Sequence, residues 1–211
     1  MDMEQYTSWW QRQGLGYRNN ALYFAGRSVT ELARQFGTPS FVYSFNRVEE
    51  NLARLCQALD DAQLKGRYSL SYAMKANRFP PLLTRLHQLG RCGIDACSPQ
   101  EVEQAMSCGF GPADISFTAG SLSQDDYTRL ARYSGLSMNC DSISAIRAWA
   151  RLRPGSAIGI RVNPAIGISR EGNSSLQYAG VCTTKFGIYK EQFFGALALA
   201  QELGLRVSRV H

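Results

Sequence analysis

One lysine, Lys75, directly follows YSLSYAM at residues 68–74, a run with the apolar character of a buried β-strand. If that strand is buried on both faces, the amine at its end is partly desolvated, and desolvation lowers the pKa of a lysine. Such an amine is nucleophilic toward an aldehyde or a ketone. The position also suits a lysine that simply extends into solvent from the end of a strand. Lys75 is therefore a candidate nucleophile, with a plain surface role as the alternative.

Polar side chains recur at the ends of the apolar runs that follow. They are Lys75, Asp95, Thr118, Asn139 with Asp141, Arg161 with Asn163, and His211. The first five positions are separated by 20, 23, 21 and 22 residues, the length of one strand–helix unit. A longer loop, residues 164–184, precedes the last strand, and loops of that length are more often functional than idle. Because ligands bind at the carboxyl ends of parallel strands, these residues predict one shared site.

The elements that must position these residues can be read from the hydrophobic periodicity. Strands are expected at 68–74, 92–96, 114–118, 136–140, 157–162 and 207–211, and helices at 81–89, 101–106, 125–132, 143–152 and 191–203. Ser98-Pro99-Gln100-Glu101 has the pattern of a complete capping box. The alternation predicts a parallel sheet, in either an open doubly wound fold or a (β/α) barrel. The absence of a GxGxxG motif argues against a dinucleotide-binding fold.

Residues 1–44 follow a different pattern. Residues 21–25 and 40–44 are expected to be strands, with an amphipathic helical turn at 29–36 between them. No helix-sized spacer precedes the first of these strands. We therefore expect residues 1–44 to form an extension outside the α/β body.

Composition excludes several classes of protein. The chain has 211 residues, 45% hydrophobic and 19% charged, which excludes a disordered protein. It has no apolar run of about 18 residues for a membrane span and no secretory signal. The net charge of +6 comes from scattered arginines without a basic stripe, so a nucleic-acid partner is not expected. Six cysteines without a CxxC pair and two histidines predict no metal site, and indicate reduced thiols in a cytoplasmic protein.

Several ordered motifs resemble one family. YAMKANRFPPLL, GIDACSPQEVEQAMSCGF, IGIRVNP and TTKFGI occur in this order, preceded by GTPSFVYSFNRVEENLARL at residues 37–55. Together they resemble the fold-type III pyridoxal-phosphate-dependent decarboxylases, and most closely the diaminopimelate decarboxylase group, over roughly residues 20–211. The resemblance implies pyridoxal 5′-phosphate as cofactor, with Lys75 forming the covalent link to it.

The same resemblance implies roles for four more residues. Asp95 and Glu101 match acidic positions around the cofactor lysine, although the capping box would also explain Glu101. Arg161 matches an arginine that faces the cofactor and can bind an anion, with a structural ion pair as the alternative. His211 resembles the first histidine of an HxHxGS stretch; if the register shifts by two, it is itself the histidine that stacks on the cofactor ring. Lys185-Phe186-Gly187 matches a KFG word for which packing is the expected role.

The fold implied is a (β/α)8 TIM-type barrel. Residues 45–211 would supply about six of its strands, and residues 1–44 would belong to a second, β-rich domain. In the family, the glycine-rich phosphate grip, the acidic partner of the pyridine nitrogen, a second phosphate arginine, and a cysteine and tyrosine donated across a dimer interface all come later in the chain. We therefore expect an N-terminal fragment that is inactive alone, and a homodimer when the protein is full length.

The activity implied is decarboxylation of a small amino-acid substrate, most simply meso-diaminopimelate to lysine. Alternatives within the class are decarboxylases of ornithine, arginine or carboxynorspermidine. A racemase is disfavoured because KANRFPPL replaces the KANAYGHG-like word. A non-catalytic single-domain pyridoxal-phosphate carrier would lack the N-terminal segment and would have a GENY-like word. A homologue that binds a partner and no cofactor is disfavoured by the presence of Lys75, Asp95 and Arg161.

Overall fold

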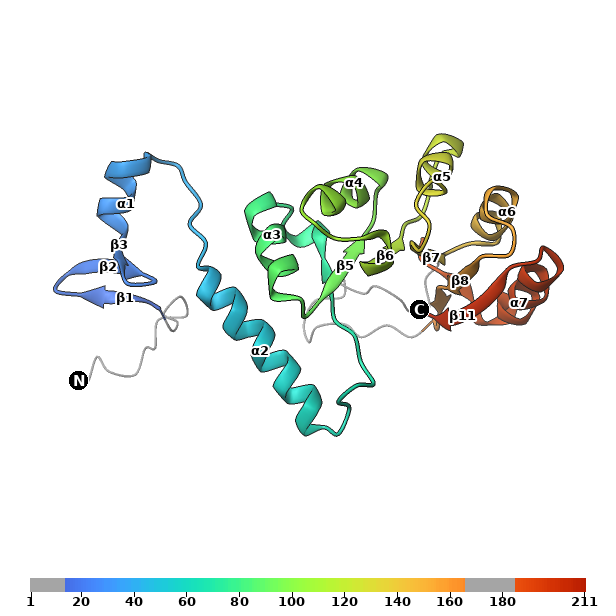
Figure 1. Ribbon diagram of the computed structural model, residues 1–211, viewed down its shortest axis with the longest axis horizontal. Helices are drawn as coiled ribbons and strands as arrows, with labels where there is room; N and C mark the ends of the chain where they lie inside the picture. The colour runs from blue at the N-terminus through green and yellow to red at the C-terminus, as the bar shows by residue number, and fades with distance from the viewer. Residues whose placement is uncertain (1–13, 166–184) are drawn as a thin grey trace. The chain divides into compact units, whose positions relative to one another are not determined.

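A computed structural model describes residues 14–165 and 185–211. The chain divides into two compact units, residues 1–54 and residues 55–211. Figure 1 labels the helices and most of the strands of both units. None of the helices in the described ranges has the length and apolar character needed to cross a membrane.

The first unit contains a small antiparallel sheet followed by a helix. Its elements are β1 (Leu15–Arg18), β2 (Ala21–Phe24), β3 (Arg27–Ser28) and α1 (Val29–Phe36). Asn19 and Asn20 join β1 to β2 with φ angles of 48° and 59°, the left-handed pair that a tight hairpin turn requires and that asparagine tolerates. Ser28 caps α1 by accepting a hydrogen bond from the Glu31 amide at 3.4 Å. The predicted strand at 21–25 and helix at 29–36 are confirmed.

The strand predicted at residues 40–44 is wrong. This segment is irregular and leads into α2 (Phe45–Asp61), and Phe41 is 90% exposed. A strand forms only where a neighbouring strand pairs with its backbone, and no described strand pairs with this segment. Helix α2 itself was not predicted, although Val48, Leu52, Leu55 and Leu59 carry the spacing of one helical face.

The second unit is built on a six-stranded parallel sheet with the order β11-β8-β7-β6-β5-β4. The strands are β4 (Ser71–Ala73), β5 (Gly93–Ala96), β6 (Ile115–Thr118), β7 (Ser137–Cys140), β8 (Ala157–Ile160) and β11 (Arg206–Val210). A further pair, β9 (Val162–Asn163) and β10 (Ile188–Tyr189), is parallel. Every predicted strand of this unit is present, and the sequential order of neighbours is that of successive βα units. The strand predicted at 157–162 is divided between β8 and β9.

Five helices cover one face of this sheet (Figure 1). They are α3 (Pro80–Leu89), α4 (Pro99–Ser107), α5 (Gln124–Leu130), α6 (Ile143–Leu152) and α7 (Phe193–Glu202). Alternate strand residues supply the apolar side of this layer, and Ile94, Phe117, Met138 and Ile160 are completely buried. The core of the second unit therefore lies between the sheet and its helices.

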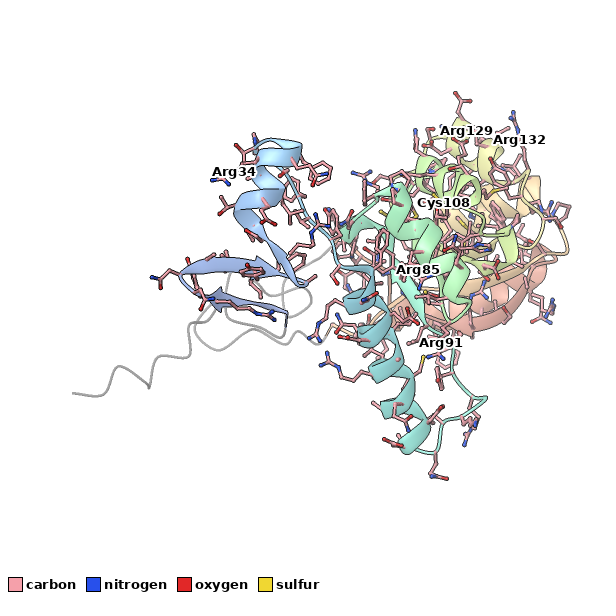
Figure 2. All side chains as sticks on the ribbon, turned by 60° about the vertical axis from the view of Figure 1, so that its left-hand side comes forward. Arg34, Arg85, Arg91, Cys108, Arg129 and Arg132 are labelled. Atoms are coloured by element: carbon pink, nitrogen blue, oxygen red, sulfur yellow. The ribbon has the colours of Figure 1, made fainter. Side chains whose placement is uncertain are left out.

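The helix layer carries arginines on several elements. Figure 2 labels Arg85 on α3, Arg91 in the turn after it, and Arg129 and Arg132 at and beyond the end of α5. Arg129 binds Glu103 of α4 through both carboxylate oxygens, each 2.8 Å from Nη2. This ion pair joins two neighbouring helices on their outer surface.

The other face of the sheet is polar. Asn139, Gly159 and Arg209 lie on this face, since a Cβ added to Gly159 would meet the side chains of the other two. Both outer strands, β4 and β11, have one unpaired side among the strands described, so the sheet is not a closed barrel. Ser71 in β4 is exposed. The prediction that the strand before Lys75 is buried on both faces is therefore wrong for the described residues, since none of the residues of β4 is fully buried.

Candidate active site

The carboxyl ends of the strands surround a cavity of about 600 Å³. Its lining residues are Lys75, Asp95, Cys97, Thr118, Ala119, Gly120, Arg161, Val162, Asn163, Pro164, Phe186 and His211. The structure thus brings together six of the predicted polar positions: Lys75, Asp95, Thr118, Arg161, Asn163 and His211. Cys97, Ala119-Gly120 and Val162 were not predicted as part of the site, since no chemical signal distinguishes them.

Lys75 lies in a short 3-10 turn, η2 (Met74–Ala76), directly after β4. Met74 beside it is completely buried and anchors the turn, while the Tyr72 hydroxyl donates to the carbonyl of Asn77 at 3.2 Å and closes it. Lys75 itself is exposed at the cavity. The amine is therefore held at the site by its backbone and is accessible to a ligand, as in the solvent-exposed alternative considered from the sequence and not as the partly desolvated amine.

Asp95 lies one residue before the end of β5 and is half-buried in the cavity wall. Burial raises the pKa of its carboxyl, while the positive charges of His211, Lys75 and Arg161 act in the opposite direction. A carboxyl group whose pKa is raised beside an amine can accept and return a proton near it. Asp95 and Lys75 line the same cavity, and their charges interact.

Arg161 lies against an aromatic ring. Its guanidinium carbon is 4.5 Å from the ring centre of Phe186, within the range of a cation–π contact. No carboxylate of the described residues lies within 4 Å of it, so the structural ion pair considered from the sequence is not found there. The charge of Arg161 also acts on Asp141, lowering a pKa that burial raises. The guanidinium is available to an anion in the cavity.

Phe186 reaches the cavity through a close packing of backbones. Asn163 is buried and donates from Nδ2 to the Phe186 carbonyl at 2.8 Å. Gly187 has a φ of 74°, and a Cβ there would lie 2.9 Å from the Asn163 nitrogen, so this position requires glycine. The Lys185-Phe186-Gly187 motif therefore has the predicted packing role, but Phe186 also lines the cavity. Sequence reasoning missed this because Phe186 is distant from Arg161 along the chain.

His211 follows β11 with its backbone fixed in the sheet. Its N–H donates to the Ile160 carbonyl at 2.9 Å, and its carbonyl accepts from the Val162 N–H at 2.8 Å. Burial, and then the nearby charge of Arg161, lower the pKa of the imidazole, against a smaller opposite effect of Asp95. The side chain lines the cavity, so His211 presents a ring nitrogen to the site that is mostly neutral near pH 7.

Glu101 is placed differently from the other predicted residues. It is 3% exposed and does not line the cavity. Its Oε2 accepts from the Cys97 N–H at 2.8 Å, and the Ser98 hydroxyl accepts from the Glu101 N–H at 3.2 Å. In a capping box the Glu101 carboxylate would accept from the N–H of the N-cap residue, Ser98. Here it accepts from the N–H of Cys97, one residue earlier, so the predicted capping box is displaced by one residue. Oε1 lies 3.8 Å from Nη1 of the exposed Arg78. The structure gives Glu101 a capping contact and no contact with the cavity.

The predicted long loop and Asn139 do not contribute to the cavity as it is described, apart from the first residue of the loop, Pro164. Most of the long loop at 164–184 lies outside the described residues, which stop at residue 165 and resume at residue 185. Asn139 points to the polar face of the sheet but does not line the cavity. Within the described ranges, no group of three or more His, Cys, Asp or Glu could hold a metal ion.

Comparison with known proteins identifies the family. Residues 46–211 match the family described as pyridoxal-dependent decarboxylase, pyridoxal binding domain. The curated diaminopimelate decarboxylase of Methanothermobacter thermautotrophicus is 32% identical over 191 residues, which cover 90% of this chain and 43% of that protein.

Two solved structures extend the comparison. A diaminopimelate decarboxylase from M. jannaschii, 24% identical, superimposes with a TM-score of 0.81 over 94% of this chain and 47% of its own. A lysine decarboxylase from Selenomonas ruminantium is 27% identical with a TM-score of 0.72, over 86% of this chain and 44% of its own. The chain therefore spans less than half the length of these relatives. The likeness confirms the predicted fold class, of which the described residues form six parallel strands and not a closed barrel. On sequence and fold together, this chain belongs to the pyridoxal-dependent decarboxylases, and residues 46–211 correspond to their pyridoxal-binding domain.

Proposed function

We propose that this chain forms the pyridoxal-phosphate-binding part of an amino-acid decarboxylase, and that Lys75 binds the cofactor covalently. One observation carries the proposal: Lys75 of the YAMKAN motif lines the same cavity as Asp95, Arg161 and His211. These are the residues that the family resemblance assigns to the cofactor, and four separate strand ends contribute them.

The residues present fit this cofactor. A cavity of about 600 Å³ suits a small ligand with a ring and a phosphate group. The Lys75 amine is the group that condenses with an aldehyde, and the Arg161 guanidinium is a donor for an anionic oxygen. His211 adds an imidazole ring with a lowered pKa, which can lie against an aromatic ring without adding a full positive charge. Glu101 is not proposed as a cofactor ligand, because its carboxylate is bound to the Cys97 amide.

The bound cofactor would supply an electron sink for the carbanion left when the substrate carboxylate departs as CO₂. The residues of this chain have separate tasks. The exposed Lys75 is accessible to exchange with a substrate amine. Asp95 can take up a proton released at that amine, because burial raises the pKa of its carboxyl. Arg161, whose guanidinium packs against Phe186, would hold an anionic group of the ligand.

For the substrate, we propose meso-diaminopimelate, which would give lysine. The proposal is supported by the names of the curated relatives, including that of M. thermautotrophicus. The likeness to a lysine decarboxylase favours lysine, or another diamino acid such as ornithine, as the second candidate. We also propose a homodimer in the cytoplasm, on the family resemblance and on the free thiols of the five described cysteines.

The test is chemical trapping of the cofactor link. The purified chain is mixed with pyridoxal phosphate, reduced with borohydride and digested for mass spectrometry. The sequence has four lysines, Lys65, Lys75, Lys185 and Lys190, so a single modified peptide can be assigned without ambiguity. We expect modification of Lys75 and loss of the visible absorption band in Lys75→Ala.

The matched control is Lys190→Ala, which removes an exposed lysine outside the cavity and should leave trapping unchanged. An unchanged spectrum in Lys75→Ala, or equal modification of all four lysines, would contradict the proposal. Release of CO₂ from meso-diaminopimelate, lysine and ornithine by the full-length protein would rank the substrates, and release from none of them would favour a non-catalytic cofactor carrier.

A further inference from the structure

A chain of hydrogen bonds crosses the polar face of the sheet and ends at the cavity. Nε of Arg209 in β11 donates to Oδ1 of Asn139 in β7 at 2.8 Å. Nδ2 of Asn139 donates to the hydroxyls of Thr118 at 2.9 Å and Ser116 at 3.0 Å, both in β6. Asn139 is 2% exposed, and only Thr118 of these four residues lines the cavity.

The direction of every bond in this chain is fixed by its first member. A guanidinium group has donors and no acceptor, so the amide oxygen of Asn139 must face Arg209. The NH₂ group then faces the two hydroxyls, and each of its hydrogens is used by one of them. A hydroxyl that accepts a hydrogen bond retains its own proton for donation. Arg209 therefore determines that Thr118 is an acceptor toward the sheet and a donor elsewhere.

The proton of Thr118 is directed to the cavity. No acceptor for this hydroxyl is found in the described part of the chain, while Thr118 lies in the cavity wall with Lys75, Asp95 and Arg161. Ser116 receives the same bond from Asn139 but lies two residues earlier in β6, outside the lining. The chain of bonds thus ends in two hydroxyl groups that each keep a proton, and of these only the Thr118 hydroxyl lies in the cavity wall.

Gly159 makes the bond between Arg209 and Asn139 possible. Strand β8 lies between β7 and β11, and Gly159 is paired in register with both Asn139 and Arg209. A Cβ at this position would collide with Oδ1 of Asn139 and would lie 2.8 Å from Cγ of Arg209. The two side chains therefore meet over a strand residue that has no side chain. In the described ranges no carboxylate lies within 4 Å of Arg209, so Asn139 is its polar contact.

We infer that Asn139 and Arg209 are positioning residues for the cofactor site, which orient the Thr118 hydroxyl to donate a hydrogen bond to an oxygen atom of bound pyridoxal phosphate. The inference rests on the proposed function, since it takes the cofactor as the occupant of the cavity. It adds two residues that do not touch the ligand and one, Thr118, that does.

The decisive variant is Asn139→Asp. A carboxylate accepts from both hydroxyls, so Thr118 would turn its proton away from the cavity and present a lone pair to an oxygen of the ligand. The dissociation constant of pyridoxal phosphate, measured by absorbance titration, should rise about tenfold, the effect of one lost hydrogen bond. The melting temperature should not fall, since the new carboxylate would lie beside the Arg209 guanidinium. A purely structural role for Asn139 would change stability and leave the dissociation constant unaltered.

A double-mutant cycle tests whether Asn139 acts through Thr118. Thr118→Val should weaken binding to a similar extent, and Asn139→Asp in that background should change the dissociation constant by less than about twofold. Ser116→Ala is the matched control, because it removes the other acceptor of Asn139 outside the cavity, and its binding should match the wild type. In the ligand-free protein, the side-chain NH₂ signals of Asn139 in NMR should shift in Thr118→Val.

The outcomes separate the two proposals. Wild-type affinity in Asn139→Asp, or a full tenfold loss added to that of Thr118→Val, would overturn this inference and leave the proposed function standing. A wild-type chain that does not bind pyridoxal phosphate would overturn the proposed function and, with it, the role of Thr118 toward the cofactor. Unchanged Asn139 signals in Thr118→Val would overturn the hydrogen-bond chain itself.

Discussion

Replacement of Glu101 distinguishes a capping carboxylate from a cofactor ligand. In Glu101→Ala, the Cys97 N–H loses its acceptor at 2.8 Å in a part-buried position. An unsatisfied polar group of this kind costs about 1–3 kcal/mol, and the pair with the exposed Arg78 adds about 0–1 kcal/mol. For a protein of this size, a loss of about 2 kcal/mol lowers the melting temperature by about 4–8 °C. Glu101→Gln keeps an amide oxygen as acceptor and should lose less than half as much.

The assay is thermal unfolding followed by circular dichroism, together with borohydride trapping of pyridoxal phosphate at Lys75. Glu103→Ala is the control, because it removes an exposed carboxylate of the same helix and should cost less than about 1 kcal/mol. Trapping in Glu101→Ala should be normal below the melting transition. An unchanged melting temperature in Glu101→Ala, or loss of trapping in the folded variant, would refute the assignment of Glu101 as a cap.

Two further predictions concern the cavity wall. Gly187→Ala places a Cβ 2.9 Å from the backbone nitrogen of Asn163 at a φ of 74°. The variant should lose about 1–3 kcal/mol of stability, measured by urea unfolding, and should displace Phe186 from Arg161, measured as weaker binding of pyridoxal phosphate. An unaltered affinity would show that Phe186 does not support the site. Burial raises the pKa of Asp95 above its value in the unfolded chain, so the folded protein binds the extra proton between the two values and loses stability as the pH rises through that window. Asp95→Asn removes this loss, so the variant should gain stability relative to the wild type as the pH rises above the ordinary aspartate pKa of about 4, whereas parallel pH curves would contradict the reasoning.

The sequence predicted the elements of the second unit because their signals are local. Helices α3 to α7 and the six strands follow from apolar periodicity and from caps such as Ser98, which depend on neighbours within a few residues. The regular separation of Lys75, Asp95, Thr118 and Arg161 also predicted that they would meet, since successive parallel strands end at one edge. The strand predicted at residues 40–44 was wrong because its signal was local as well. The composition of this segment is typical of a strand, but a strand also needs a neighbouring strand to pair with, and composition does not show whether one is present.

What the sequence determined by itself is thus the order of the strands and the chemical groups at their ends, because periodicity and spacing are written along the chain. The tertiary structure alone decided how each group is used. It leaves Lys75 exposed in the wall of the cavity, it binds Glu101 to an amide, and it brings Phe186 against Arg161. It also joins Arg209 to Asn139 across Gly159. These contacts depend on which strands are neighbours and which way alternate side chains point, and both are set by packing between segments distant in the sequence.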